Sequence, residues 1–446
     1  MVGQSLLHCV ASLLAFACAP SVALVEGAWR NQLHGHWEGH LEHKERLFAI
    51  RLNVTDEGPT MRATLDLPEY CIYGSSAKLS IRGDTVTIAT DDITVQAKLT
   101  EDVLTGKSQG FRDIRANVLL ERETVDPVRY RHEELEFESE SARLAGTLVF
   151  PAGAGPFPLV VWTHGSGPDT RSTFYYSGRA HLFAQAGIAS LIYDKRGSGK
   201  STGDASWKLD NLVVDAVAAV GAVATHRDVD PDAIGIAGFS QGGWVAPIAA
   251  TLEDAIDFIL VGATPGISVG EQNIYSATSR LRRDGLSAAD VAAAQDFLTR
   301  LYAFYETGEG REEVLRMISE AENSAWYVSR WVANVTFISK SGLIQGKHPS
   351  WDPSLPDVSS IWSKVSVPVL SIWGANDVDV PPEESKRAIE AALRSASNTD
   401  FELRIFPDAS HGFWQSDGSE EWDWPRQAPG CHQLLVDWTL DHVGER

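Results

Sequence analysis

The chain of 446 residues is long enough for two domains, and with 43% hydrophobic and 22% charged residues its composition is that of an ordinary globular protein with a sizeable core. Its formal net charge of -22 disfavours nucleic acid or an anionic membrane surface as a partner. The composition carries no signal for an oligomeric state.

Residues 1–23 are typical of a secretory signal peptide. Residues 5–18 are mostly apolar and have about the length of a signal's hydrophobic region, and Ser21-Val22-Ala23 matches a small-x-small cleavage site. We expect cleavage and a secreted or periplasmic mature protein; the alternative is an uncleaved N-terminal anchor. No other stretch is long and apolar enough to span a bilayer, so no integral membrane segment is expected after cleavage.

Removal of the signal would leave two cysteines, Cys71 and Cys431. Two cysteines in an exported protein can form one disulfide. They lie far apart in the sequence, however, so a disulfide and two separate buried thiols are equally consistent with it.

Residues from about 30 to 122 predict a small β-rich N-terminal domain, either a barrel or a sandwich. Short segments that alternate or are rich in β-branched residues are separated by Gly, Pro and Asp. These segments are 47–54, 61–67, 77–81, 85–90 and 93–99. The stretch before them carries His34, His36, His40 and His43. No cysteine or clear carboxylate set completes a metal site there, so a solvated edge strand is the favoured interpretation.

A polar stretch at 123–131 is expected to link this domain to a second one at 132–446. Residues 135–137 and 145–150 predict a hairpin, after which apolar strand-like runs alternate with helical stretches. These runs are 159–163, 188–193, 233–237, 258–262, 367–372 and 402–406. Continuous apolar runs separated by helices are typical of a mainly parallel sheet covered on both faces, so the predicted fold class is α/β.

The interval from about 264 to 365 interrupts this alternation. Helical stretches at 288–306 and 312–331 occur there without any signal for a central strand. A long insertion between core strands is commonly functional, so we interpret this interval as an inserted helical cap. An amphipathic helix at 432–442 is expected to close the chain.

The pentad GFSQG at 238–242 directly follows an apolar strand-like run and directly precedes a helix-like run. This context predicts a nucleophile elbow, in which Ser240 occupies a strained turn between strand and helix. The flanking glycines are expected because the turn is too crowded for a Cβ atom. A second match, GISVG at 266–270, follows Pro265 and opens no compact helix, so Ser268 is assigned to the loop that enters the cap.

A serine hydroxyl becomes a good nucleophile only when a base removes its proton, and that base is commonly a histidine oriented by a carboxylate. His411 lies on a loop after the last predicted strand, and Asp377 ends the strand before it. The three residues occur in the chain order Ser240, Asp377, His411, which is a known order for a Ser-Asp-His triad. All three also fall at the carboxyl ends of predicted strands, where open α/β sheets bind ligands. Asp379 is the rival acid and His164 the rival base.

Acyl transfer also needs hydrogen-bond donors directed at the developing oxyanion. The residue after the nucleophile, Gln241, is expected to supply one backbone N–H. The glycine-rich loop at 164–168 is expected to supply the other, from Ser166. The alternative for this loop is an ordinary glycine-rich turn.

The segment DKRGSGKS at 194–201 ends like a phosphate-binding loop. Asp194 stands where the first glycine of that motif belongs, and its charge would repel a phosphate. We therefore expect a turn after a strand, in which Asp194 and Arg196 hold neighbouring loops by charged hydrogen bonds.

Taken together, five segments resemble the α/β-hydrolase superfamily, most closely the capped serine esterases, acyl-thioester hydrolases and serine aminopeptidases. They are HGSGP at 164–168, DKRGSGKS at 194–201, GFSQGG at 238–243, GANDVDVP at 374–381 and SHGF at 410–413. The resemblance implies a catalytic triad of Ser240, His411 and Asp377, an acyl-enzyme, and oxyanion donors at Ser166 and Gln241. It implies no metal and no organic cofactor, and it does not extend to the N-terminal domain.

The leading functional prediction is an exported serine hydrolase that cleaves carboxylic esters of small-molecule acyl substrates. The first alternative is a serine aminopeptidase or amidase, which would need acids in the cap to hold a free amine. Glu271, Glu306 and Glu320 are available, but nothing in the sequence singles them out. The second alternative is a non-catalytic binding protein on a hydrolase fold.

Overall fold

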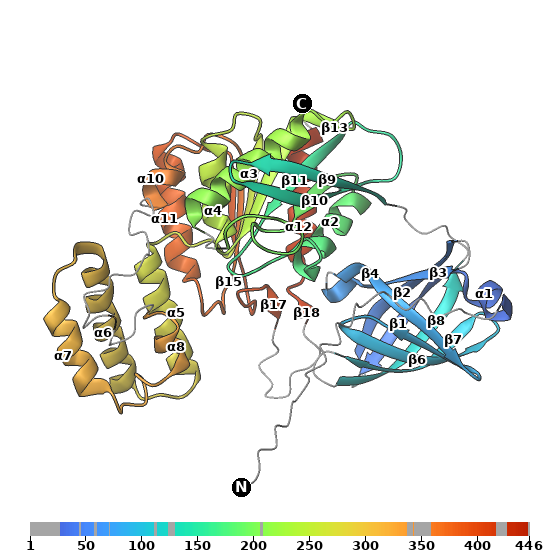
Figure 1. Ribbon diagram of the computed structural model, residues 1–446, viewed down its shortest axis with the longest axis horizontal. Helices are drawn as coiled ribbons and strands as arrows, with labels where there is room; N and C mark the ends of the chain where they lie inside the picture. Colours follow the sequence, from blue (N-terminus) through green and yellow to red (C-terminus); the bar gives the residue numbers. More distant parts are fainter. Residues whose placement is uncertain are drawn as a thin grey trace, which may run out of the picture. The chain divides into compact units, whose positions relative to one another are not determined.

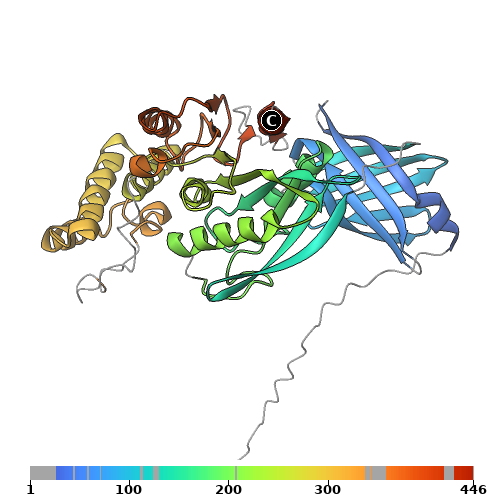
Figure 2. The same ribbon diagram turned by 90° about the horizontal axis from the view of Figure 1, so that it is seen from above.

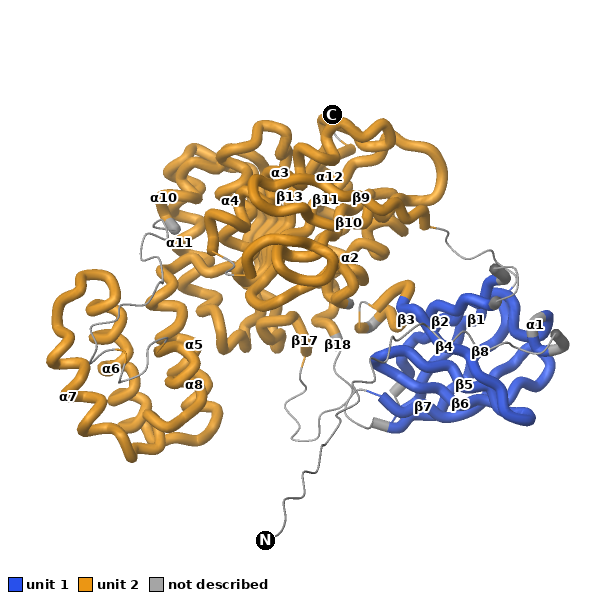
Figure 3. Tube along the Cα trace, in the orientation of Figure 1, with its two compact units in different colours: residues 1–65, 75–125 blue, residues 66–74, 126–446 orange. Residues whose placement is uncertain are grey.

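A computed structural model describes residues 27–43, 46–57, 60–70, 72–110, 114–123, 130–205, 208–336, 342, 358–415 and 426–444. The chain divides into two units, residues 1–65 with 75–125 and residues 66–74 with 126–446 (Figure 3). The expected signal peptide at 1–23, the central residues of the expected linker and Cys71 lie outside the described residues.

The first unit contains a short helix, α1 (Gly27–Leu33), and is built on a closed eight-stranded barrel (blue in Figures 1 and 2). The strands are β1 (Gly35–His43), β2 (Arg46–Glu57), β3 (Thr60–Leu67), β4 (Ile72–Arg82), β5 (Thr85–Ala89), β6 (Ile93–Thr100), β7 (Val103–Gly110) and β8 (Ile114–Glu123). Buried residues alternate with more exposed ones, as at Ile93, Val95 and Ala97 of β6, because successive side chains point to opposite faces of a strand. One face of each strand therefore fills the barrel.

The β-rich N-terminal domain is confirmed, but the edge strand predicted for the histidine-rich stretch is wrong. This stretch forms β1, which pairs antiparallel with β2 on one side and with β8 on the other. His36, for example, lies opposite Asn53 and opposite Glu123. Closure of the barrel pairs the first strand with the last, and this long-range pairing removes the edge.

The second unit contains an eight-stranded sheet with the order β16-β15-β14-β13-β11-β12-β10-β9. Its strands are β9 (Arg131–Ser139), β10 (Ala142–Phe150), β11 (Phe157–Thr163), β12 (Ala189–Tyr193), β13 (Val229–Phe239), β14 (Phe258–Gly262), β15 (Val369–Gly374) and β16 (Phe401–Phe406). The predicted hairpin is β9–β10, β10 is also antiparallel to β12, and the neighbours from β12 to β16 pair in parallel. The mainly parallel sheet is therefore confirmed.

Helices cover both faces of this sheet (Figure 1). One face packs against α3 (Leu209–Ala224), α4 (Gly242–Ala250), α10 (Val358–Trp362) and α11 (Pro382–Ser395); the other packs against α2 (Phe174–Gln185) and α12 (Cys431–Gly444). On β11, Leu159 and Val161 face the first layer, and Val160 and Trp162 face the second. Burial on both faces explains why central strands such as β12, β14 and β15 are continuously buried and mostly apolar.

The helical cap lies between β14 and β15 (ochre in Figures 1 and 2). Its helices are α5 (Val269–Arg283), α6 (Ala288–Thr307), α7 (Arg311–Ala321) and α8 (Arg330–Ala333), and they share a hydrophobic cluster of their own. The single helix predicted at 312–331 is wrong, because α7 ends at Ala321 and Ser329 caps the start of the separate helix α8. Among the described residues, no helix combines the length and the apolar character needed to cross a bilayer.

Candidate active site

Ser240 lies in the turn that joins β13 to α4. Its φ is +55°, a left-handed conformation that is strained for a residue with a side chain. A Cβ atom on Gly238 would lie 2.0 Å from the carbonyl oxygen of Gly242, and one on Gly242 would lie 2.9 Å from Thr163 Oγ1. Both flanking glycines are therefore required, Gly238 by a contact within the turn and Gly242 by the neighbouring residues Thr163 and His164.

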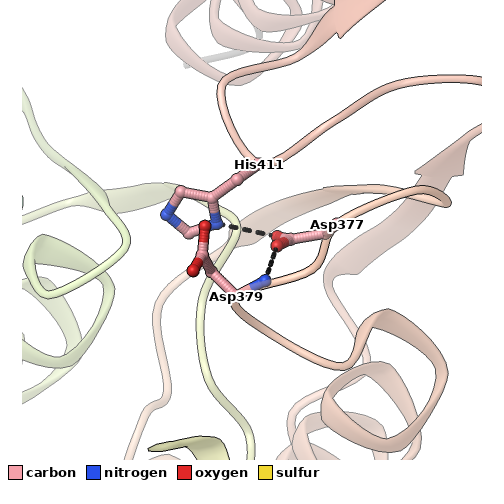
Figure 4. Close-up of side chains that lie close together, drawn as sticks. All are labelled: Asp377, Asp379 and His411. Atoms are coloured by element: carbon pink, nitrogen blue, oxygen red, sulfur yellow. Dashed lines mark hydrogen bonds and ion pairs between the residues drawn. The ribbon is translucent and has the colours of Figure 1, made fainter. Parts of the chain in front are cut away.

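His411 and Asp377 are brought together by the loops that follow β16 and β15. His411 Nδ1 lies 2.8 Å from Asp377 Oδ2. The other carboxylate oxygen, Oδ1, accepts hydrogen bonds from the backbone N–H groups of Asp379 at 2.7 Å and Val380 at 2.9 Å. The second ring nitrogen of His411 points away from both carboxylates (Figure 4). Asp377 therefore fixes the imidazole with Nδ1–H as the donor and leaves Nε2 available as a proton acceptor.

The charges around His411 favour its protonated form. Burial opposes protonation, but the hydrogen bond and the negative charge of Asp377, together with the charge of Asp379, outweigh burial and raise the pKa of His411. Arg280 acts in the opposite direction, since its positive charge lowers that pKa. Such an imidazole can hold a proton while a bond is made or broken beside it.

Contacts between neighbouring side chains connect the serine turn to the histidine loop. Phe239, which precedes Ser240, packs edge to face against Phe413 with ring centroids 5.9 Å apart. The backbone N–H of Ser240 donates to Gly262 O at 2.9 Å. Among the hydrogen bonds of the described residues, none joins Ser240 to His411, and catalytic contacts are commonly longer before substrate binds.

The two expected oxyanion donors lie at the ends of neighbouring strands. Gln241 is the N-cap residue of α4, and Ser166 follows β11. Within the described part of the chain, neither backbone N–H has a hydrogen-bond acceptor. An N–H at a helix N-terminus is also suited to negative charge because of the helix dipole.

The rival residues have other contacts. His164 is buried, its Nε2 donates to Tyr193 O at 2.6 Å, and burial lowers its pKa to about 3. Asp379 accepts hydrogen bonds from Arg280 and from Ser276 Oγ. The serine of the second G-x-S-x-G match, Ser268, caps α5. These contacts leave Ser240, Asp377 and His411 as the better candidates.

Asp377, Asp379 and His411 are also the group that could offer ligands to a metal ion, since their ligand atoms lie within 4.8 Å of one another (Figure 4). Arg280 already places a cation beside Asp379, and burial, which opposes ionisation of Asp379, is outweighed by this partner, so its pKa is lowered. The Asp377–His411 hydrogen bond uses the Nδ1 atom. Two of the ligand atoms that a metal ion would need are thus already engaged in hydrogen bonds within the protein.

The turn after β12 behaves as predicted. Arg196 forms a bidentate pair with Asp215 at 2.7 and 2.6 Å, and both side chains are buried. Asp194 accepts hydrogen bonds from the backbone N–H groups of Arg171 at 3.0 Å and Lys200 at 2.8 Å. The role of these charges in holding neighbouring loops is therefore confirmed.

Two charged residues near the site were missed by sequence reasoning. Arg280 of cap helix α5 contacts the loop that carries Asp377, and nothing in its sequence context points to this contact. Lys195 lies between Asp194 and Arg196 in the turn after β12, and this position between two residues with predicted roles could have drawn attention to it.

A mainly parallel eight-stranded sheet with a serine turn after its central strand and an aspartate–histidine pair at the same edge defines an α/β-hydrolase domain. Residues 160–422 match the Alpha/beta hydrolase family, and the chain belongs to this family. The predicted fold class is thereby confirmed.

Several known proteins are similar to this chain. Esterase EstD of Thermotoga maritima is 28% identical over 294 residues, which are 64% of this chain and 61% of that protein. The chain thus spans less than two thirds of the length of this relative. An uncharacterised 31.7 kDa protein of Escherichia coli is 23% identical over 61% of this chain and 89% of its own length. The solved structure of a Pyrococcus furiosus esterase, Pf2001, is 18% identical with a TM-score of 0.43 and covers 71% of this chain and 90% of its own.

Proposed function

We propose that this protein is an exported serine hydrolase that cleaves carboxylic esters through an acyl-enzyme on Ser240. His411 acts as the base and then as the acid, and Asp377 orients it. The observation that carries the proposal is the 2.8 Å hydrogen bond between Asp377 and His411, at the same sheet edge as the strained turn of Ser240.

In the first half of the reaction, Ser240 Oγ attacks the acyl carbon while its proton passes to His411 Nε2. The oxyanion that forms accepts hydrogen bonds from the backbone N–H groups of Ser166 and Gln241. Collapse of the tetrahedral intermediate breaks the ester bond, and the proton on His411 passes to the leaving alcohol. In the second half, His411 takes a proton from the water that attacks the acyl-enzyme and returns it to Ser240 Oγ as the acyl–oxygen bond breaks, which releases the acid.

Esters are favoured over peptides because two of the three acids considered for a free amine have other partners, and the third, Glu306, is exposed near the end of α6. Glu271 forms the capping box of α5 with Ser268. Glu320 pairs with Arg316 on the surface of α7. The similar protein EstD is named as an esterase, which agrees with this preference.

Export forms part of the proposal and rests on the signal-like residues 1–23. Expression of the full chain in a secreting host, followed by N-terminal sequencing of the released protein, tests it. A mature protein that begins at residue 24 supports export, and a full-length protein retained in the cell contradicts it.

Labelling with a fluorophosphonate probe tests the nucleophile. The wild-type protein should be labelled and Ser240→Ala should not, whereas Ser268→Ala should be labelled like the wild type. A protein that folds but takes up no label is the non-catalytic binding protein that the sequence left open.

A substrate panel then separates the two enzyme classes. The purified protein is assayed on p-nitrophenyl esters of graded chain length and, in parallel, on aminoacyl anilides. Turnover of the esters with little turnover of the anilides supports the proposal, and the reverse preference contradicts it in favour of an aminopeptidase.

A further inference from the structure

Lys195 lies beneath the two loops that carry the oxyanion donors, and its side chain is fully buried. Its ammonium group donates to Gly165 O at 2.7 Å and to Gln241 Oε1 at 3.0 Å. A buried lysine is costly unless its charge has partners. These two acceptors belong to segments that the proposed mechanism uses.

The first contact acts on the peptide that contains the Ser166 N–H. Gly165 O and Ser166 N belong to one planar, trans peptide group, in which C=O and N–H point in opposite directions. The ammonium group of Lys195 binds Gly165 O on one side of this peptide, and the Ser166 N–H therefore points to the opposite side. It also polarises the peptide, and hydrogen bonds in such a chain strengthen one another.

The second contact acts on the other donor. Gln241 caps α4 and follows Ser240 directly, and its side chain is held by the same ammonium group. Lys195 thus connects the loop after β11 to the start of α4. On its other side the same loop is held by Tyr176, whose hydroxyl accepts from the Gly165 N–H at 2.9 Å and donates to Asp169 at 2.8 Å.

We propose that Lys195 is a positioning residue for the oxyanion hole. It fixes and polarises the Gly165–Ser166 peptide and holds the Gln241 side chain at a fixed position relative to that peptide. This inference rests on the proposed function. Lys195 does not touch the substrate; it acts through the two backbone donors.

The charge of Lys195 is sensitive to pH near neutrality. Burial lowers the pKa of Lys195 to about 8, although Asp169 and Asp215 oppose this shift. The titratable and charged groups around it are His164 after β11, Asp169 and Tyr176 on the following loop and α2, Arg196 beside it, and Asp215 on α3. Burial also raises the pKa of Tyr176 well above its usual value and keeps that of His164 low, so neither changes charge between pH 7 and 9.

The primary test is Lys195→Met, which keeps the length of the side chain and removes the charge. We expect kcat on p-nitrophenyl acetate to fall about 10- to 100-fold, somewhat less than the loss of a donor itself, with little change in KM. Lys200→Met, which removes an exposed lysine from the same turn, is the matched control and should leave kcat unchanged.

The pH profile supplies a readout that a purely structural role would not move. The kcat of the wild-type protein should decline as pH rises through about 8 towards that of Lys195→Met, whose own profile should stay flat there. This lysine binds fewer protons in the folded state than in the unfolded state at that pH, so its own titration does not destabilise the fold as pH rises. Thermal unfolding followed in parallel separates the two effects.

Gln241→Leu provides a second variant should Lys195→Met not fold. It keeps the backbone donor, removes one contact of Lys195, and should lower kcat several-fold. A Lys195→Met variant with wild-type kcat, an alkaline decline that it shares with the wild type, or a wild-type profile that is flat to pH 9.5 would overturn the inference. If one of these three outcomes is found while the fluorophosphonate still labels the protein normally, the inference on Lys195 is wrong and the proposed function stands. If Ser240 is not labelled, the proposed function and the inference on Lys195 are both wrong.

Discussion

Replacement of Asp377 by asparagine tests the hydrogen bond on which the proposed mechanism depends. In the structure, Oδ1 accepts from two backbone N–H groups and Oδ2 accepts from His411 Nδ1. In Asp377→Asn the amide oxygen is held by the backbone donors, so the NH₂ group faces His411. The imidazole must then accept at Nδ1 and carry its proton on Nε2, where it can no longer take the proton of Ser240.

The expected loss in kcat is large because the wrong tautomer is stabilised while the packing is unchanged. The corresponding change in a serine protease lowers kcat about 10⁴-fold, which corresponds to about 5.4 kcal/mol of barrier. The assay is kcat on p-nitrophenyl acetate, with circular dichroism to verify folding. A folded variant that retains more than about a tenth of wild-type kcat would refute the assignment of Asp377.

Asp379→Asn is the matched control, since its carboxylate contacts Arg280 and Ser276 rather than the His411 ring nitrogens. Asp379 lies two residues from Asp377 on the same loop, and its replacement by asparagine changes the same chemical group. We expect a loss of about tenfold or less, because one nearby charge alters the pKa of His411 without changing its tautomer. An equal loss in both variants would mean that the two carboxylates share the role.

Three further predictions concern charge. Because neutral His411 is the base and its pKa is raised, kcat/KM should fall as pH decreases through a value above the ordinary histidine pKa, measured as the acidic limb of the pH profile. The acidic limb should move to lower pH in Asp379→Asn, which removes a negative charge, and to higher pH in Arg280→Met, which removes a positive charge. If the limb moves in the same direction in both variants, the assignment of His411 as the base is wrong. Asp215→Ala should lower the free energy of unfolding by about 3–5 kcal/mol in urea titrations, because it removes the carboxylate that pairs with the buried Arg196 guanidinium, and a loss below about 1 kcal/mol would be inconsistent with that pair.

The features that could be predicted from the sequence are those whose chemistry is local. The turn at Ser240 needs Gly238 because a Cβ atom there would meet the carbonyl oxygen of Gly242, and the glycines on both sides of the serine are visible in five consecutive residues. The loops of Asp377 and His411 could be placed because each directly follows an apolar strand, and the ends of parallel strands share one sheet edge.

The features that could not be predicted depend on distant partners. Strand β1 reads as an edge because its pairing with β8 is formed by residues about 80 positions away. Helix α7 ends at Ala321, although the sequence pattern predicts a helix that continues to residue 331. Ser324 donates hydrogen bonds to the Ala321 carbonyl oxygen, and Ser329 caps the start of the next helix, α8. Lys195 gains its role only when Gly165 and Gln241 converge on it from two other strands.

The cap has an interior of its own, separate from the two layers that cover the sheet. Residues inside it can be exchanged without disturbing the packing that supports the serine and histidine turns. Helix α5 joins the cap to the loop of Asp377 and Asp379: Tyr275 and Gln272 donate to the carbonyl oxygens of Asp377 and Asp379, and Ser276 and Arg280 donate to the Asp379 carboxylate. Substitutions in the cap interior can thus change the cap while the loop of Asp377 and Asp379 keeps its contacts, and among the described cap helices α5 is where a substitution would reach that loop directly.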